Sequence, residues 1–315
     1  MTQQVITVAA PAKINWTLDV YDRYPPGHPQ HGFSKLRSVM QLLDLEDLVE
    51  VGYRPGKGTI TVAADEPSVP QTSRGNAEEN ICFRVLKLLQ EHFAIFRTYD
   101  FDVRLEKRIP LAGGLGGSST DGSAVLSALL SAFAIPLEES ERLALAARVG
   151  SDRPFFSLRR SLALVSGRGE SVVALPPRSE VVHLLLINPG VPLHVATVFR
   201  SLHEHRARTG SRSGEFTDRF LAKLSGRSLL DALSCAGNDL AEAPAVREIL
   251  PEYENLCSLL HAAGCPAALL SGSGPTVFAG GRSADHIAMV AEQVRERFPQ
   301  MNLLTTTTRT TELTN

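Results

Sequence analysis

The chain has 315 residues, of which 43% are hydrophobic and 21% are charged, and its 32 Lys and Arg nearly balance its 34 Asp and Glu. This composition is typical of a globular protein and excludes collagen, an intrinsically disordered chain and a disulfide scaffold. The formal net charge of -2 gives no long-range attraction to nucleic acid or to an acidic membrane, so any recognition of an anion must be local.

The first hundred residues predict mainly short strands separated by turns. Residues 5–9, 48–51 and 59–62 are rich in β-prone side chains. Proline and glycine residues at 25–29 exclude a helix between the first two of these strands. The pattern therefore indicates a strand-rich start.

The next segment predicts a helix, a strand, a glycine-rich loop and a second helix. Asn80 is a suitable N-cap for a helix whose apolar side chains at 81, 85, 88 and 89 share one face. Residues 101–106 alternate apolar and polar side chains, which indicates a half-exposed strand. After the glycine-rich stretch at 112–117, apolar side chains at helical spacing predict a helix over 118–133.

A further helix is expected over residues 137–149. It is expected to end at Gly150, because glycine readily adopts the left-handed turn that closes helices. A strand at 162–165 follows. The doublet Pro176-Pro177 then marks the predicted boundary between two domains, 1–175 and 176–315.

The second half predicts alternating strands and helices around one polar segment. Residues 203–219 are rich in Arg, Ser and Gly and predict a mobile loop, in which Arg206, Arg208 and Arg212 are candidates for an anion contact. The regular elements expected on either side are strands at 181–187, 267–270 and 276–279, helices at 252–263 and 284–298, and a threonine-rich terminal strand at 305–311 with a frayed tail.

The cysteines and the N-terminus favour a cytoplasmic protein. Cys82, Cys235, Cys257 and Cys265 form no C-x-x-C pair and have no histidine at zinc-finger spacing, as expected of reduced thiols. The first residues lack a basic segment followed by an apolar run, and no apolar run approaches the roughly 20 residues that cross a bilayer. We therefore expect neither secretion nor a membrane partner.

The most informative segment is PLAGGLGGSSTDGSA at 110–124. Its clustered glycines expose successive backbone N–H groups, and the helix that follows points its positive dipole end at the loop, so the segment suits phosphate. A loose turn between strand and helix is the alternative. No lysine follows as in a Walker A loop, and Ser119 stands where a dinucleotide fingerprint needs its third glycine.

Three other sites are candidates for chemistry, each with a structural alternative. Lys13, in APAKIN after the first strand, is a candidate for phosphate contact or a snorkelling surface lysine. Asp152 is a candidate for proton transfer or an N-cap or turn residue. The small residues at 271–274 allow close approach of a ligand or form only a tight hairpin.

Taken in order, PAKIN, PLAGGLGGSS, GSDRPFF and LLSGSGPTVFA resemble the signature of the GHMP kinases. Within that superfamily, HGFSKLRSVMQLLDL, GRGE, NPGV and NDL most resemble the 4-diphosphocytidyl-2-C-methyl-D-erythritol kinases. The resemblance runs from about residue 11 to residue 279.

This resemblance implies a two-domain α+β fold, with an N-terminal domain like the second domain of ribosomal protein S5 and a ferredoxin-like C-terminal domain. The active site would lie in the cleft between them. The implied reaction is ATP-dependent phosphorylation of the 2-hydroxyl of 4-diphosphocytidyl-2-C-methyl-D-erythritol, in the non-mevalonate isoprenoid route. The implied partners are a small-molecule substrate, ATP and Mg²⁺, with no nucleic acid.

The resemblance also implies a role for each matching residue. Asp152 would accept or orient the proton of the attacking hydroxyl, and Lys13 would keep Asp152 ionised and draw the reacting groups together. Asn15, Phe33 and Phe199 would bind the acceptor, the two aromatic rings by stacking on cytosine. The residues that would bind ATP are Pro110, Leu111, Ala112, Gly113, Gly114, Leu115, Gly116, Gly117, Ser118, Ser119, Thr120, Ser273 and Gly274.

The departures from the family pattern fall mainly at the acceptor end. His31-Gly32-Phe33-Ser34 stands where the family has D-G-Y-H, so His28, His31 or a backbone amide would have to read the base edge. Another GHMP kinase, acting on homoserine or mevalonate, is therefore the alternative enzyme. A non-catalytic binding protein is the other alternative, and the presence of both Lys13 and Asp152 argues against it.

Overall fold

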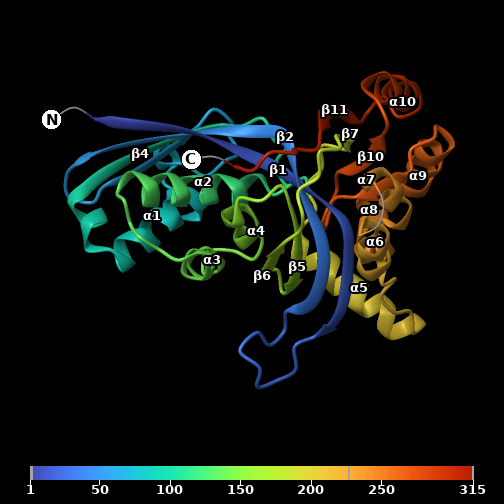
Figure 1. Ribbon diagram of the computed structural model, residues 1–315, viewed down its shortest axis with the longest axis horizontal. Coiled ribbons are helices and arrows are strands. Elements are labelled where there is room, and N and C mark those ends of the chain that lie inside the picture. The colour runs from blue at the N-terminus through green and yellow to red at the C-terminus, as the bar shows by residue number, and fades with distance from the viewer. Residues whose placement is uncertain (1–2, 226–227, 314–315) are drawn as a thin grey trace.

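Two long antiparallel strands, β1 (Gln4–Arg23) and β2 (Ser34–Pro55), form the centre of the larger of two sheets (Figure 1). The computed structural model describes residues 3–225 and 228–313. The strand order is β3-β4-β2-β1-β8, with β5 pairing with β2 and β6 with β5. The remaining strands of this sheet are β3 (Ile60–Ala64), β4 (Tyr99–Glu106), β5 (Leu162–Gly167), β6 (Ser171–Ala174) and β8 (Gly237–Asn238).

The prediction of short strands at 5–9 and 48–51 was wrong about length. Residues 10–20 of β1 are buried without interruption, because one face meets the helices of the first half and the other meets the second sheet. Burial on both faces removes the alternation that marks a strand in a sequence. Bulges between Pro11 and Lys13 and between Asn15 and Thr17 also interrupt the register.

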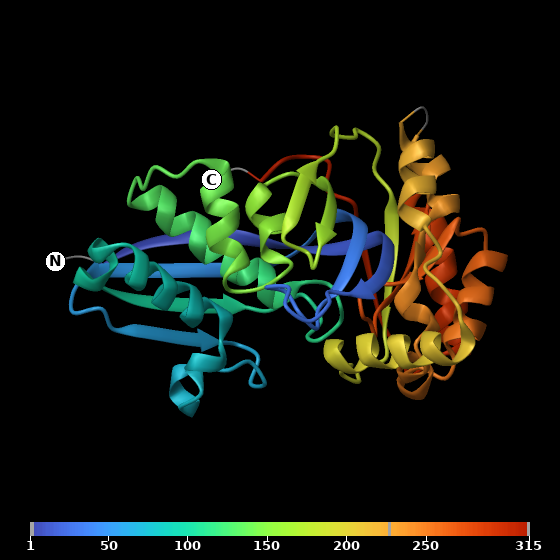
Figure 2. The ribbon, with the colours of Figure 1, turned by 90° about the horizontal axis from the view of Figure 1, so that it is seen from below.

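Four helices cover one face of the larger sheet (Figure 2). The expected helix after Asn80 is confirmed, since the Asn80 side chain accepts a hydrogen bond from the Cys82 amide. The order of strand, glycine loop and helix is also confirmed. The four helices are α1 (Ile81–His92), α2 (Gly117–Ala132), α3 (Glu139–Ala147) and α4 (Arg153–Leu158).

The expected end of the third helix at Gly150 was wrong. Helix α3 ends at Ala147, and Gly150 does not adopt the left-handed conformation. The amides of Arg148 and Val149 bond to carbonyls three residues earlier, so a tightened last turn closes the helix without glycine.

The second sheet has the order β11-β7-β10-β9 and lies at the other end of the molecule (Figure 1). Its strands and helices fall close to the expected positions, and Gly264, with φ of +87°, follows the helix it was expected to stop. The elements are β7 (His183–Asn188), β9 (Ala267–Leu270), β10 (Val277–Gly281), β11 (Asn302–Thr307), α7 (Leu229–Ala232), α8 (Pro244–Ile249), α9 (Tyr253–Ala262) and α10 (Ala284–Arg297).

An apolar cluster joins the two sheets. Trp16 of β1 meets Phe278 of β10 edge to face, with ring centroids 5.5 Å apart. The Pro176-Pro177 doublet lies in the extended connection from β6 to β7, and the chain returns twice to the larger sheet. The first return is β8, which pairs with β1. The second is the segment after β11, where Arg309 donates its amide to the Leu42 carbonyl of β2, and this segment runs back along the larger sheet in Figure 2.

The predicted mobile loop at 203–219 is mostly helical. Helix α5 (Val195–Thr209) and helix α6 (Phe216–Leu224) cover the segment except for residues 210–215. The prediction failed because distant residues anchor both helices: Leu202 and Phe220 are buried in the core, and Arg206 lies 3.1 Å from Asp239 and donates to the Val20 carbonyl. Arg206 is therefore part of the interior and is not free for an anion.

None of the helices in the described ranges combines the length and apolar character needed to span a bilayer. All four cysteines are free thiols.

Arg206→Ala should destabilise the fold by about 3 kcal/mol, because it leaves the fully buried Asp239 carboxylate without its cation. Urea unfolding followed by circular dichroism measures the change. The exposed Arg208 on the same helix provides the control, and Arg208→Ala should change the free energy of unfolding by less than about 0.5 kcal/mol. Equal effects of the two substitutions would show that the Arg206 ion pair contributes nothing.

Candidate active site

Lys13 lies inside the fold at the bulge of β1. Its side chain is 4% exposed, and its Nζ donates to Asn15 Oδ1 at 2.7 Å and lies 4.0 Å from Asp152 Oδ2. Its backbone amide donates to the Leu115 carbonyl at 2.9 Å, which ties β1 to the glycine loop. Lys13 is therefore not a snorkelling surface lysine.

Burial and Asp152 act on the pKa of Lys13 in opposite directions. Burial lowers the pKa of the ammonium, and the negative charge of Asp152 opposes that shift. Asp152 occupies the N-cap position of α4, yet its side chain makes no capping hydrogen bond. The Asp152 side chain is 38% exposed, so its carboxylate faces both Lys13 and solvent.

A short chain of hydrogen bonds fixes the Asn15 amide. Asn15 Nδ2 donates to Ser38 Oγ at 2.7 Å, and Ser38 Oγ donates to the Thr17 carbonyl at 2.6 Å. These bonds hold Asn15 Oδ1 toward Lys13. Ser38 was not expected from the sequence, because a serine within a strand carries no signal that it supports a side chain on the neighbouring strand.

The glycine loop packs too closely for side chains at two positions. A Cβ on Gly114 would lie 2.0 Å from the Ser271 carbonyl, and one on Gly116 would lie 2.7 Å from Phe156 Cζ. Both glycines have positive φ, +74° and +78°. No side chain caps α2, which leaves the amides of its first turn for a ligand.

A buried cluster fastens the two ends of this loop. Lys107 Nζ binds Asp47 and lies 2.6 Å from Asp121 Oδ2, while Asp47 Oδ1 accepts the amides of Arg108 and Ile109. Burial raises the pKa of Asp121 to about 7; Lys107 opposes that shift and Asp47 adds to it. The sequence analysis did not single out Lys107 and Asp47, although Lys107 directly precedes the loop.

Two hydrogen bonds from Asn238 hold the turn at 271–274. Asn238 Nδ2 donates to the carbonyls of Leu270 and Gly272 at 2.8 and 2.7 Å. Ser271 Oγ donates to the Gly114 carbonyl at 3.1 Å, so this turn and the glycine loop are joined. The turn is a hairpin between β9 and β10 and also one wall of the site.

These elements surround a cleft of about 270 Å³. The expected site residues that line it are Lys13, Asn15, Pro110, Leu111, Ala112, Gly113, Gly114, Leu115, Gly116, Gly117, Ser118, Ser119, Asp152, Phe199 and Ser273. Three others lie elsewhere. Thr120 is buried on another side of α2, Gly274 packs against Leu270, and Phe33 is 50% exposed beneath the Arg168 guanidinium.

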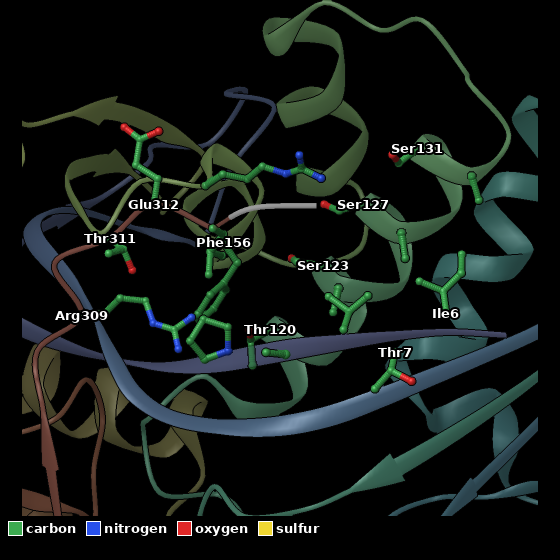
Figure 3. Close-up of a pocket in the computed structure, with 18 of the residues that line it drawn as sticks. Ile6, Thr7, Thr120, Ser123, Ser127, Ser131, Phe156, Arg309, Thr311 and Glu312 are labelled. Carbon is green, nitrogen blue, oxygen red and sulfur yellow. The ribbon is translucent and has the colours of Figure 1, made fainter.

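A larger cavity of about 700 Å³ lies between the start of β1, α2 and the C-terminal segment (Figure 3). Three serines of α2, Ser123, Ser127 and Ser131, line it, but neither Lys13, Asp152 nor any loop glycine does. Its Arg309 is paired with Asp44 and Glu46. Because size alone does not make a site, we place the candidate site in the smaller cleft, where polar groups converge.

Comparison with known proteins agrees with this geometry. The models of the GHMP kinase N-terminal and C-terminal domains match residues 80–159 and 221–300. A 4-diphosphocytidyl-2-C-methyl-D-erythritol kinase of Geobacter sulfurreducens is 33% identical over 292 residues, which cover 93% of this chain and 95% of that protein. The chain belongs to this kinase family.

Solved structures confirm the fold. A 4-(cytidine 5'-diphospho)-2C-methyl-D-erythritol kinase superposes with a TM-score of 0.70 at 26% identity, over 96% of this chain and 99% of that one. A homoserine kinase from Cytophaga hutchinsonii gives 0.69 at 18% identity, over 98% and 96%, which shows the fold alone. The chain has the expected two-domain α+β fold of an ATP-dependent small-molecule kinase.

Asp121→Asn should change how stability depends on pH. The carboxyl titrates near 3.8 when unfolded and near 7 when folded, so the folded state binds the extra proton between these values. The stability of the parent relative to Asp121→Asn should therefore fall as pH rises through this window and level off above it. Urea unfolding at several pH values measures the difference. A difference that stays constant with pH would contradict the raised pKa of Asp121.

Proposed function

We propose that this protein transfers the γ-phosphate of ATP to the 2-hydroxyl of 4-diphosphocytidyl-2-C-methyl-D-erythritol. The observation that carries the proposal is the meeting of Lys13 and Asp152, 4.0 Å apart, at the edge of a cleft that the glycine loop also lines. Phosphoryl transfer needs an oriented hydroxyl, charge neutralisation and fixed phosphates. The cleft offers Asp152 to orient the hydroxyl, Lys13 to neutralise charge and the glycine loop to fix the phosphates.

In this proposal Asp152 and Lys13 are the catalytic residues. Asp152 accepts or orients the proton of the acceptor hydroxyl, since its carboxylate is the half-exposed partner of the pair. Lys13 keeps that carboxylate ionised and places positive charge between the hydroxyl and the transferred phosphate. The hydrogen bond to Asn15 holds the ammonium in position without neutralising it.

ATP is proposed to bind with its phosphates along residues 110–119 and beside Ser273. The free amides at the start of α2 and the hydroxyls of Ser118 and Ser119 supply donors there. Asp152 and these hydroxyls suit Mg²⁺, which prefers oxygen ligands and binds proteins through few carboxylates when phosphates complete its shell. Mg²⁺ would neutralise phosphate charge during transfer.

The acceptor is proposed to lie across Asn15 and Phe199, which both line the cleft. Phe199, on α5, offers a ring face for the cytosine base. Phe33 lies outside the cleft lining, which weakens its part in the expected pair of stacking rings. The alternative, a kinase of the same mechanism with a smaller alcohol as acceptor, rests on this position of Phe33 alone.

We also propose a domain boundary at Pro176-Pro177 and a cytoplasmic location. The proline doublet between the two sheets supports a division into 1–175 and 176–315. The four free cysteines support a cytoplasmic protein.

Asp152→Asn should reduce turnover by roughly 100- to 10,000-fold, because the amide cannot accept the hydroxyl proton. The formation of a phosphomonoester on 4-diphosphocytidyl-2-C-methyl-D-erythritol, followed by phosphorus NMR, measures turnover. Calorimetry without Mg²⁺ should show ATP affinity nearly unchanged, since the proposed phosphate donors are the amides and hydroxyls of residues 110–119. The exposed Asp285→Asn is the control. Turnover of Asp152→Asn within threefold of the parent would remove Asp152 from the mechanism.

The same assay with homoserine and mevalonate tests the choice of acceptor. The proposal expects efficient turnover of the cytidine-bearing alcohol only. Preferential phosphorylation of either smaller alcohol would favour the alternative kinase.

A further inference from the structure

The larger cavity, which the proposed function does not use, is lined by an unpaired guanidinium. Arg159 directly follows α4, lines the cavity and is half-buried. The nearby Arg142 and Arg160 form ion pairs with Glu139 and Glu312. Among residues 3–225 and 228–313, the Arg159 side chain has neither a carboxylate partner nor a hydrogen-bond acceptor. The described residues therefore leave its charge uncompensated.

The electrostatic surroundings of Arg159 favour an anion. Burial lowers the pKa of its guanidinium, and the positive charge of Arg142 adds to this shift. The other charged residues that line the cavity, Arg309 and Glu312, are already in ion pairs. An anion beside Arg159 would offset both the burial and the repulsion without breaking an existing pair.

The backbone at Arg159 does not explain why an arginine stands there. Its φ of +64° lies in the left-handed region, which favours glycine. The Arg159 amide closes α4 by donating to the Phe156 carbonyl at 3.3 Å, and the Arg159 carbonyl accepts the Leu313 amide at 3.1 Å. Glycine would make both backbone contacts with less strain, so the arginine side chain is the informative feature of this position.

Hydroxyl groups follow one face of α2 along the same cavity (Figure 3). Ser123, Ser127 and Ser131 are four residues apart, which places their side chains in one row. Ser123 Oγ donates to the Arg153 carbonyl at 3.4 Å. Within the described part of the chain, the hydroxyls of Ser127 and Ser131 have no hydrogen-bond partner, so they are available to donate to a ligand.

The cavity also has apolar walls. Ile6 and Val8 of β1 and Leu313 of the C-terminal segment line it. Its volume of about 700 Å³ lies within the range of sites that hold small molecules. A guanidinium and several hydroxyls can together bind the oxygens of a phosphate group, while the apolar walls suit a short hydrocarbon chain.

Helix α2 separates this cavity from the catalytic cleft. Ser118 and Ser119 line the cleft, whereas Thr120 and Ser123 line the cavity. The two have no lining residue in common, so both can be occupied at the same time.

We propose that the cavity is a second ligand site, which binds a small phosphorylated molecule with a short apolar chain. Arg159 donates to the phosphate oxygens, and Ser127 and Ser131 supply further donors. The chain of the ligand packs against Ile6 and Val8. This site is independent of the acceptor that the catalytic cleft takes.

Calorimetric titration with n-butyl phosphate tests the site. The protein is first saturated with Mg²⁺ and a non-hydrolysable ATP analogue, so that the glycine loop is occupied. The parent should bind n-butyl phosphate, and Arg159→Gln should bind it at least about 10-fold more weakly, because the cation is lost. Ser127→Leu should abolish binding by filling the cavity. Arg208→Gln, which removes an exposed charge on α5, is the matched control and should bind as the parent does.

Two simpler probes separate the contributions of the phosphate and of the chain. Inorganic phosphate should bind more weakly than n-butyl phosphate, and 1-butanol should not bind detectably, because each lacks one of the two groups. Affinity for 1-butanol equal to that for n-butyl phosphate would show that the cavity does not recognise an anion, and would overturn the assignment.

Equal binding by the parent and Arg159→Gln, or binding that disappears when the ATP analogue is present, would also overturn it. Thermal unfolding followed by circular dichroism checks that each variant is folded. A chain that ends at Leu313 is titrated as well, because residues 314 and 315 lie outside the described ranges. Failure of both this chain and the parent to bind n-butyl phosphate would equally reject the site.

Discussion

A buried ammonium must be compensated by the groups around it, and the catalytic half of this fold is arranged around one such ammonium, that of Lys13. The bulge in β1 turns Lys13 toward the glycine loop, Asn15 accepts one of its hydrogen bonds, and Asp152 supplies the opposite charge from α4. Since Asp152 also faces solvent, a substrate hydroxyl can reach it. The contacts of Lys13 therefore bring together a strand, a loop and a helix from distant parts of the sequence.

The loops around Lys13 are fixed by polar contacts beneath them. The cluster of Lys107, Asp47 and Asp121 fastens both ends of the glycine loop, and Asn238 fastens the turn at 271–274. Buried hydrogen-bonded clusters of this kind restrict the motion of the loops they hold, which suits a site that works by positioning phosphates. The end of the cleft proposed for the acceptor is built differently, from β1, β2 and the side of α5, so in this proposal acceptor choice can change without disturbing phosphate transfer.

Local patterns predicted the parts of the structure that depend on local interactions. The helix capped by Asn80, the strand at 101–106 and the loop-to-helix segment after it follow from spacing, capping and glycine content. Motif order placed Lys13, Asp152 and Phe199 in one cleft. What spacing did not reveal depends on distant partners. Burial on both faces hid the length of β1, and the polar segment at 203–219 is anchored by contacts with distant residues such as the pairing of Arg206 with Asp239.

The most direct test of the central role of Lys13 is the titration of its Nζ by NMR, with Lys13→Met used to assign the signal. We expect a pKa below the ordinary value of 10.5, because burial outweighs the charge of Asp152. The pKa should fall further in Asp152→Asn, which removes that charge. An ordinary pKa that does not respond to Asp152→Asn would show that Lys13 is solvated and independent of Asp152, and would contradict the arrangement described for the active site.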